Sequence, residues 1–284
     1  MERYLNLPFN GSAHGGELDF LTGLVHWVMA ILFVGWSIYF VVALVRFRGG
    51  RQQTARYAGA KGHFSTYGEV GVALVEIALL IGFAVPMWAR RVSALSPEER
   101  QRAIEVRVVG EQFAWNIHYP GADGRFGRTD VKLISTGTNP LGIDRNDPAA
   151  ADDVTTINQL HLEVNRPAYI RLSSKDVIHS FFLPTMRVKQ DAIPGMEIPV
   201  HFTPTAVTPP EATLPGCAAT MDCWEISCAQ LCGLSHYRMK GFFTVHDAAG
   251  YQAWLAGAAP KPPAPPAAPA EPAAAPAAAP APAP

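Results

Sequence analysis

The chain has 284 residues and a formal net charge of −1, and 49% of its residues are hydrophobic and 17% are charged. The near-neutral charge gives no support for nucleic-acid binding, and the hydrophobic content excludes disorder along most of the chain. All four cysteines fall between residues 217 and 232, which suggests a local site rather than the framework of a small disulfide scaffold.

Two apolar segments near the N-terminus are long enough to cross a membrane. Residues 20–45 contain 21 apolar residues out of 26 and no charged side chain, and residues 70–89 contain 16 out of 20 with one charge, Glu76. After an N-terminal segment 1–19, we therefore predict transmembrane helices over 20–45 and 68–90, which form a hairpin. The alternative for the first is a cleaved signal peptide, although its apolar core would be shorter and its start basic.

The connection between these helices predicts their orientation. Residues 46–67 contain five basic residues and no acidic one, which indicates a cytoplasmic loop. Both termini, and everything after the linker 91–103, are then expected on the periplasmic or outer side of a bacterial-type plasma membrane. Glu76 lies about six residues inside the second helix, where a carboxylate is costly. It is a functional candidate facing another helix or a watery path, unless it snorkels toward the headgroups.

Residue 104 begins a different pattern of short β-branched and aromatic segments separated by Gly, Pro, Asn and Asp. Such a pattern is typical of an antiparallel β-sandwich or barrel, here over residues 104–257. The expected strands are 104–109, 113–119, 160–164, 168–172, 197–202 and 241–246. We expect a surface loop over 137–156 and a short helix over 247–257. Residues 258–284 contain 14 Ala and 11 Pro, which predicts a disordered or extended tail.

The densest chemistry lies in the segment CAQLCGLSHYRM, which spaces Cys228, Cys232, His236 and Met239 by four, four and three residues. Thiolate, thioether and imidazole ligands favour copper or zinc over magnesium or calcium. A second imidazole, His179, stands upstream in DVIHSF. Two thiolates on one loop can bridge two metal ions, with one histidine terminating each ion and Met239 and a backbone carbonyl between the cysteines in weak axial positions.

Three other interpretations of these residues stay open. The two cysteines could form a Cys228–Cys232 disulfide in an oxidising compartment, or a structural zinc site with His179 and His236, or the redox motif of a copper chaperone. The number and softness of the ligands favour binuclear copper.

The sequence resembles subunit II of haem-copper cytochrome c oxidases over residues 20–246, in the two helices and in GEQFAWNIHYPG, DVIHSFFLP, KQDAIPG and CAQLCGLSHYRM. The resemblance implies an all-β, cupredoxin-like Greek-key sandwich with a binuclear CuA centre. It implies electron transfer from a c-type cytochrome to the haem-copper subunit I that reduces dioxygen, coupled to proton translocation. The expected partners are subunit I, other oxidase subunits and membrane lipid, with no nucleic acid. The implied copper ligands are His179, Cys228, Cys232, His236, Met239 and the backbone carbonyl of Gln230.

The resemblance also assigns roles outside the ligand set, with two departures. Glu76, in VEIALLIGF, corresponds to a glutamate of a proton-input pathway. Where the family usually has Glu between the cysteines, Gln230 keeps the carbonyl but lacks the carboxylate that helps to hold magnesium at the subunit boundary. The family's Trp-Tyr-Trp stretch reads Phe113-Ala114-Trp115, so Trp115 is the electron-input candidate here, unless Phe113 and Trp115 are simply sandwich core.

Further observations concern a second cysteine pair, the electron donor and the alternative functions of the protein. Cys217 and Cys223 lie outside the family's ligands, and we hypothesise a disulfide between them. Residues 104–257 contain 16 acidic and 12 basic side chains, and this net charge of −4 suits a basic c-type cytochrome. A membrane-held cytochrome docked by apolar contacts is the alternative donor. The rival functions are a structural quinol oxidase subunit II, against which the retained ligands argue, and a membrane-anchored copper chaperone.

Overall fold

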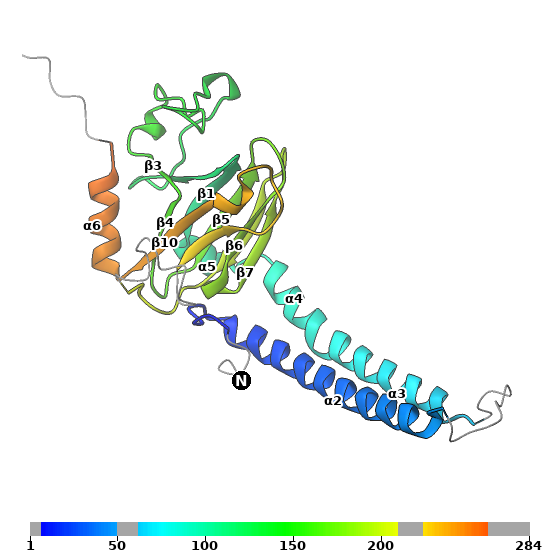
Figure 1. The fold of residues 1–284 in the computed structure, drawn as a ribbon. Coiled ribbons are helices and arrows are strands. Elements are labelled where there is room, and N and C mark those ends of the chain that lie inside the picture. Colours follow the sequence, from blue (N-terminus) through cyan, green and yellow to red (C-terminus); the bar gives the residue numbers. More distant parts are fainter. Residues whose placement is uncertain (1–6, 50–61, 210–223, 261–284) are drawn as a thin grey trace, which may run out of the picture.

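The computed structural model describes residues 7–49, 62–209 and 224–260. Two long helices run antiparallel and side by side away from a β-sandwich (Figure 1). The first is α2 (Gly15–Phe47), and the second joins α3 (Phe64–Leu79), the π-helical turn η1 (Leu80–Ala84) and α4 (Val85–Val92). Both are long and apolar enough to span a membrane. The predicted hairpin is therefore present, although each helix extends beyond the bounds expected from composition. Most of the predicted cytoplasmic loop, residues 50–61, lies outside the described residues.

The π-helical turn in the second helix has a local cause in the sequence. Proline lacks the N–H of a helical residue, and its ring crowds the carbonyl of the preceding turn. Pro86 is the second residue after η1, and the N–H of Val85 donates to the carbonyl of Leu80, five residues back. The wider turn accommodates the proline without breaking the helix.

In the part of the chain that the structure describes, the linker contains a short helix and the sandwich contains ten strands. Helix α5 (Pro97–Arg102) lies within the predicted linker and begins with a capping box between Ser96 and Glu99. The strands are β1 (Ile104–Glu111), β2 (Ala114–Tyr119), β3 (Val154–Ile157), β4 (Gln159–Glu163), β5 (Ala168–Ser174), β6 (His179–Leu183), β7 (Val188–Ala192), β8 (Ile198–Phe202), β9 (Glu225–Cys228) and β10 (Lys240–His246).

The strands form two five-stranded sheets, ordered β3-β2-β1-β5-β8 and β4-β10-β9-β6-β7. The chain crosses between the sheets several times, as in a Greek key, and the predicted cupredoxin-like sandwich is confirmed. The expectation of a purely antiparallel sandwich was wrong in two places, because β1 pairs with β5 and β4 with β10 in parallel. Crossovers between sheets produce these pairs, since they return the chain beside an earlier strand in the same direction.

The core lies between the two sheets. Alternate residues of β1 and β5 point inward, and Val106, Val108, Ile170 and Leu172 have no exposed surface. The predicted loop 137–156 ends inside strand β3, so its last residues are not loop. The predicted C-terminal helix is α6 (Ala248–Ala258), whose first turn is capped by the Asp247 carboxylate. The predicted tail, residues 258–284, was placed one residue too early, because Ala258 is the last residue of α6, and from residue 261 onward the tail lies outside the described residues.

The chain before α2 is part of the sandwich. Gly11 N–H donates to the Thr185 carbonyl at 2.8 Å, and Thr205 N–H donates to the Gly11 carbonyl at 2.7 Å. At the start of α2, Arg187 donates to both oxygens of the Asp19 carboxylate, at 2.7 and 2.9 Å, and both side chains are largely buried. A bidentate pair of this kind fixes orientation as well as distance. The first helix is therefore held firmly against the domain.

Candidate metal centre

Strand pairing brings the predicted ligands together at one end of the second sheet. His179 is the first residue of β6 and Cys228 the last of β9, and these strands pair with Phe181 opposite Cys228. Cys232 and His236 lie in the loop that follows β9, and Met239 directly precedes β10. Backbone pairing thus joins ligands that are about fifty residues apart in the sequence.

Two sulfur atoms form the middle of the site. Cys228 Sγ and Cys232 Sγ are 3.8 Å apart, and both residues are free thiols. His179 Nδ1 lies 4.0 Å from Cys228 Sγ, and His236 Nδ1 lies 3.5 Å from Cys232 Sγ. Each sulfur therefore has its own imidazole, and both rings present the same nitrogen.

Two weaker donors complete the set. Met239 Sδ lies 3.7 Å from Cys232 Sγ, and the Gln230 carbonyl oxygen lies 3.2 Å from Cys228 Sγ. Met239 and Cys232 are buried, whereas the Gln230 side chain is exposed. The Gln230 backbone oxygen therefore lies beside the sulfurs, and its role as a ligand stays a prediction.

These distances suit metal ligation. Two thiolates on one tetrahedral ion, at about 2.3 Å each, are separated by roughly 3.8 Å. This is the separation of the two sulfurs here, and it is far from the ~2.05 Å of a disulfide. The ligand atoms of His179, Cys228 and Cys232 all lie within 4.8 Å of one another, so this group can hold a metal ion. Six donors exceed the four that a structural zinc ion takes.

Two residues that the sequence analysis did not identify orient the ligands. The Asp176 carboxylate accepts a hydrogen bond from His179 Nε2 at 2.8 Å, which leaves the Nδ1 lone pair for a metal. Gln112 donates its backbone N–H to Asp176 at 2.8 Å and its side-chain amide to the Cys232 carbonyl at 2.6 Å. Gln112 thus connects Asp176, which orients His179, to the backbone of Cys232. Gln112 is 64 positions from Asp176 and 120 from Cys232, so spacing gave no signal for it. Asp176 stands three residues before His179, within the DVIHSF segment, and that short spacing could have identified it.

The centre is tightly packed on the side of the first sheet. A Cβ added at Gly110 would lie 2.9 Å from His179 Cδ2, closer than such contacts normally come. The Trp115 ring lies edge-on to the His179 ring, with centroids 6.0 Å apart, and has no exposed surface. Trp115 is therefore both sandwich core and neighbour of a ligand. No partner protein can touch it directly.

The thiols differ in their tendency to ionise. Burial opposes the ionisation of Cys228, but hydrogen bonding with His179 and with the backbone outweighs it and lowers the pKa to about 6. Burial, followed by the neighbouring Cys228 thiolate, raises the pKa of Cys232 to about 12. Two adjacent thiolates repel each other, so a bound cation is needed before both can stay ionised.

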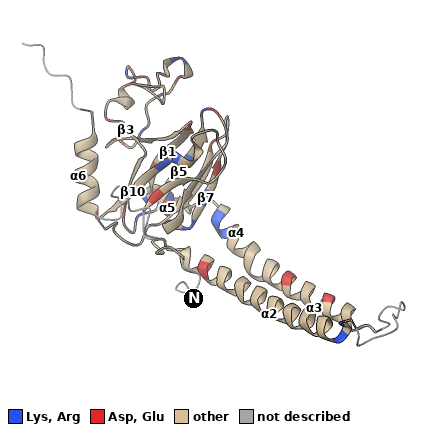
Figure 2. Ribbon diagram, viewed as in Figure 1, with Lys and Arg blue, Asp and Glu red and all other residues tan. Residues whose placement is uncertain are grey.

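The other sequence candidates lie elsewhere. Glu76 is exposed on α3, and Glu69 stands two turns earlier on the same face. Figure 2 shows that the acidic positions of α3 lie apart from the sandwich. Cys217 and Cys223 lie outside the described residues, so their predicted disulfide stays a prediction.

The fold and the site define a class: a membrane-anchored cupredoxin-like domain with a sulfur-rich metal centre. Residues 104–208 match the family described as "Cytochrome C oxidase subunit II, periplasmic domain". An alternative cytochrome c oxidase subunit 2 of Bradyrhizobium diazoefficiens is 30% identical over 241 residues, covering 84% of this chain and 79% of that protein. Cytochrome c oxidase subunit 2 of Cereibacter sphaeroides is 25% identical over 252 residues, covering 84% and 75%.

Among solved structures, the periplasmic domain of cytochrome oxidase subunit II from Bradyrhizobium japonicum is similar with a TM-score of 0.36 and 22% identity, covering 55% of this chain and 92% of that one. The chain belongs to the cytochrome c oxidase subunit II family. It is a membrane-anchored subunit of a haem-copper oxidase, an oxidoreductase complex, and its family normally binds copper.

Proposed function

We propose that this subunit holds a binuclear CuA centre, which takes single electrons from a c-type cytochrome and passes them to the haem-copper subunit. The observation that carries the proposal is the pair of sulfurs 3.8 Å apart with an imidazole at each end. Cys228, Cys232, His179 and His236 would hold the copper, and the centre would supply one-electron transfer.

The chain's own residues prepare the ligands. Asp176 holds His179 with Nδ1 free, and Gln112 anchors the ligand loop through the Cys232 carbonyl. Cys232 and Met239 are almost fully buried, which excludes water from one side of the centre. A rigid, dry site limits the reorganisation that accompanies electron transfer. Gln230 has no carboxylate to offer, so we propose no magnesium ligand at this position.

The surface over the centre favours an apolar contact with the donor. Leu231, Leu234 and Tyr237 alternate with the ligands on the same loop and are 78%, 93% and 73% exposed. Apolar side chains exposed to this degree in one loop mark an interaction surface. We propose that the cytochrome docks there and that charge steering from the net −4 of residues 104–257 is secondary. Trp115 stays our candidate for relaying the electron, acting through its contact with His179 rather than by touching the donor.

We place the exported domain and both termini on the periplasmic or outer side, with the basic loop in the cytoplasm. Glu76 then lies toward the cytoplasmic end, exposed to subunit I or lipid, and is our proton-input candidate. Glu76→Gln should slow proton-coupled oxidase turnover in the assembled complex while leaving copper content unchanged. Unchanged turnover would remove this role.

Copper counting and electron paramagnetic resonance on the full chain test the copper proposal. Two coppers per chain with a mixed-valence signal support it. One exchangeable Cu(I) would indicate a chaperone, bound zinc a structural site, and no metal a quinol-oxidase type of subunit. Cys228→Ser should abolish the mixed-valence signal while leaving the fold. Cys217→Ser is the matched control, because it removes a cysteine outside the ligand set.

A further inference from the structure

The ligand loop, residues 229–239, has few hydrogen bonds to the rest of the protein. Its start is held by the second sheet, because the N–H of Ala229 donates to a carbonyl of β6 at 3.0 Å. Its middle is held from the first sheet, where the side-chain amide of Gln112 donates to the Cys232 carbonyl at 2.6 Å. Among the described residues, this is the one hydrogen bond that joins residues 230–235 to a residue far away in the sequence. The position of the middle of the loop therefore depends on Gln112.

The turn between β1 and β2, which consists of Gln112 and Phe113, lies directly against the backbone of the ligand loop. Gly233 follows Cys232 with a φ of +132°. A Cβ added at Gly233 would lie 2.6 Å from Gln112 Nε2 and 3.2 Å from Phe113 Cζ. Glycine suits both this conformation and this close approach, because it has no Cβ. The turn therefore contacts the loop at one defined point, Cys232 and Gly233.

A shift at this point would reach the other ligands of the loop. The Gly233 carbonyl accepts a hydrogen bond from the N–H of His236 at 3.1 Å. The His236 carbonyl in turn accepts one from the N–H of Met239 at 3.1 Å. These bonds join successive turns of the backbone, so Cys232, His236 and Met239 would move together.

Gln112 also contacts the support of the histidine at the other end of the centre. Its backbone N–H donates to Asp176 Oδ2 at 2.8 Å, while Asp176 Oδ1 accepts from His179 Nε2 at 2.8 Å. The contact with Asp176 uses the backbone of Gln112, whereas the contact with Cys232 uses the side chain. A substitution at position 112 can therefore remove the second contact and keep the first.

We propose that Gln112 is a positioning residue of the metal centre. Its side-chain amide holds the ligand loop in the metal-binding arrangement before any metal is present, and its backbone N–H holds the other end of the centre through Asp176. A loop that is ordered in advance loses less conformational freedom when it binds, so the metal is held more tightly. The inference rests on the proposed function for the identity of the metal, but the positioning is a property of the metal-free chain.

Hydrogen–deuterium exchange of the metal-free full chain measures the order of the ligand loop. Gln112→Met keeps a side chain of similar length without the donor, and Gln112 is an exposed residue, so the core should stay intact. We expect the backbone amides of residues 229–239 to exchange about fivefold faster, as for the loss of one hydrogen bond. Gln159→Met is the matched control. Gln159 is exposed on β4, in the same sheet as the ligands, and its side chain has no hydrogen bond among the described residues.

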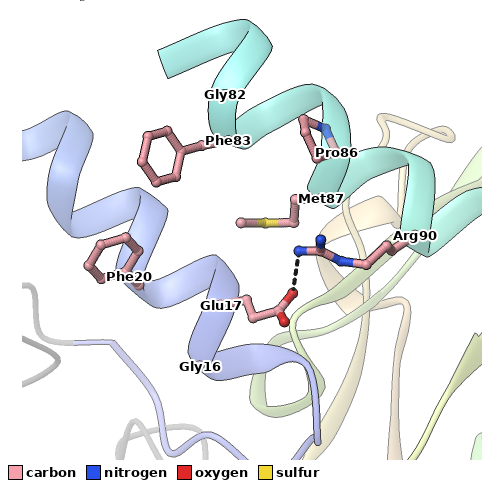
Figure 3. A pocket seen from close by; sticks show the side chains of 8 residues that line it. All are labelled: Gly16, Glu17, Phe20, Gly82, Phe83, Pro86, Met87 and Arg90. Atoms are coloured by element: carbon pink, nitrogen blue, oxygen red, sulfur yellow. Dashed lines mark hydrogen bonds and ion pairs between the residues drawn. The ribbon is translucent and has the colours of Figure 1, made fainter. Parts of the chain in front are cut away.

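Arg90→Gln is a second control, for the loss of a contact elsewhere in the chain. Figure 3 shows that Arg90 donates to Glu17 between the two membrane helices, at 3.0 Å. Loss of this ion pair should leave the exchange of the ligand loop unchanged. If Arg90→Gln accelerated it as much as Gln112→Met does, the effect would be a general loosening and the role of Gln112 would be refuted.

Copper competition with a chelator tests whether the position of the loop matters for binding. Gln112→Met should bind copper about 10–100-fold more weakly than Gln159→Met, as when a ligand loses its support. Gln112→Lys keeps a donor that can reach the Cys232 carbonyl, so it should recover part of the affinity and part of the protection from exchange.

Three results would overturn the proposal. These are equal exchange in Gln112→Met and Gln159→Met, faster exchange with unchanged copper affinity, and equal behaviour of Gln112→Met and Gln112→Lys. A wild-type chain that binds no pair of copper ions would instead refute the proposed function. The exchange comparison needs no metal and would still decide whether Gln112 positions the loop.

Discussion

Gly110→Ala is the sharpest test of how the sandwich holds its metal ligand. The added methyl would lie 2.9 Å from His179 Cδ2, 3.2 Å from His179 Cγ and 3.3 Å from Trp115 Cζ3. Carbon atoms in contact prefer about 3.5–4.0 Å, so the imidazole has to retreat by roughly half an ångström. Trp115 cannot give way easily, because it is fully buried and packs edge-on against Phe181.

The expected magnitude follows from two opposing effects. Overpacking a core costs about 1–3 kcal/mol, and replacing glycine by alanine recovers roughly 0.4–1 kcal/mol through the unfolded chain. A net loss of about 1–2 kcal/mol lowers the midpoint of thermal unfolding by about 2–8 °C. A displaced His179 should also weaken copper binding by about 10–100-fold, as when a ligand loses its support.

Thermal unfolding and copper competition with a chelator measure the two effects of Gly110→Ala separately. Gly137→Ala is the matched control, because a Cβ at that position meets nothing within 4 Å. If Gly110→Ala and Gly137→Ala have the same midpoint and the same copper affinity, the close packing of His179 does not constrain the centre and the reasoning is refuted.

Further predictions concern a ligand support, a buried histidine and the helix joint. Asp176→Asn removes the carboxylate that accepts from His179 Nε2, so copper affinity should fall by about 10–100-fold in chelator competition. Burial, followed by the nearby His246, lowers the pKa of His161 from 6.5 to about 4. Between pH 6.5 and 4 the unfolded chain therefore binds a proton that the folded chain does not, so the free energy of unfolding should fall by about 3 kcal/mol across this window in denaturant unfolding. Arg187→Gln leaves the Asp19 carboxylate buried without its partner and should destabilise the protein by about 3–5 kcal/mol in the same assay.

Each of these has its own control. His161→Phe should flatten the acid dependence of stability, and an unchanged slope would show that another group is responsible. Asp176→Glu should restore part of the copper affinity lost in Asp176→Asn, because it restores a carboxylate. No recovery would indicate that the backbone turn at this position, rather than the carboxylate, supports His179. The double variant Asp19→Asn, Arg187→Gln should be more stable than Arg187→Gln alone, and the opposite order would contradict a charge-pairing role.

The two helices could be predicted from composition, but their ends could not. Helix α2 begins at Gly15, but the predicted helix begins at residue 20, because a search for apolar residues rejects a segment that contains Glu17 and Asp19. Asp19 is tolerated there because Arg187, 168 residues later, neutralises it. Such a long-range partner leaves no trace in the local pattern.

Some strands and site residues could likewise be predicted from the sequence, whereas others could not. β3 (VTTI) lies between acidic residues and turn signals and was assigned to a loop, whereas β1 and β5 were found because their apolar residues alternate. The ligand set followed from spacing and donor chemistry within one short loop plus one upstream histidine. Gln112 and Gly110 could not be found, since they reach the site only through the pairing of β1 with its neighbours.

The segment before the first membrane helix also completes the base of the sandwich domain. The Phe9 ring stacks on that of Trp224 with centroids 6.2 Å apart, and Gly11 fits so closely that a Cβ would lie 2.7 Å from Met186 Cε. A recombinant fragment that begins at residue 104 lacks Phe9 and Gly11, so the side chain of Trp224 would be more exposed to solvent. The sandwich can therefore be completed only when residues from before the first membrane helix meet residues synthesised much later in the chain.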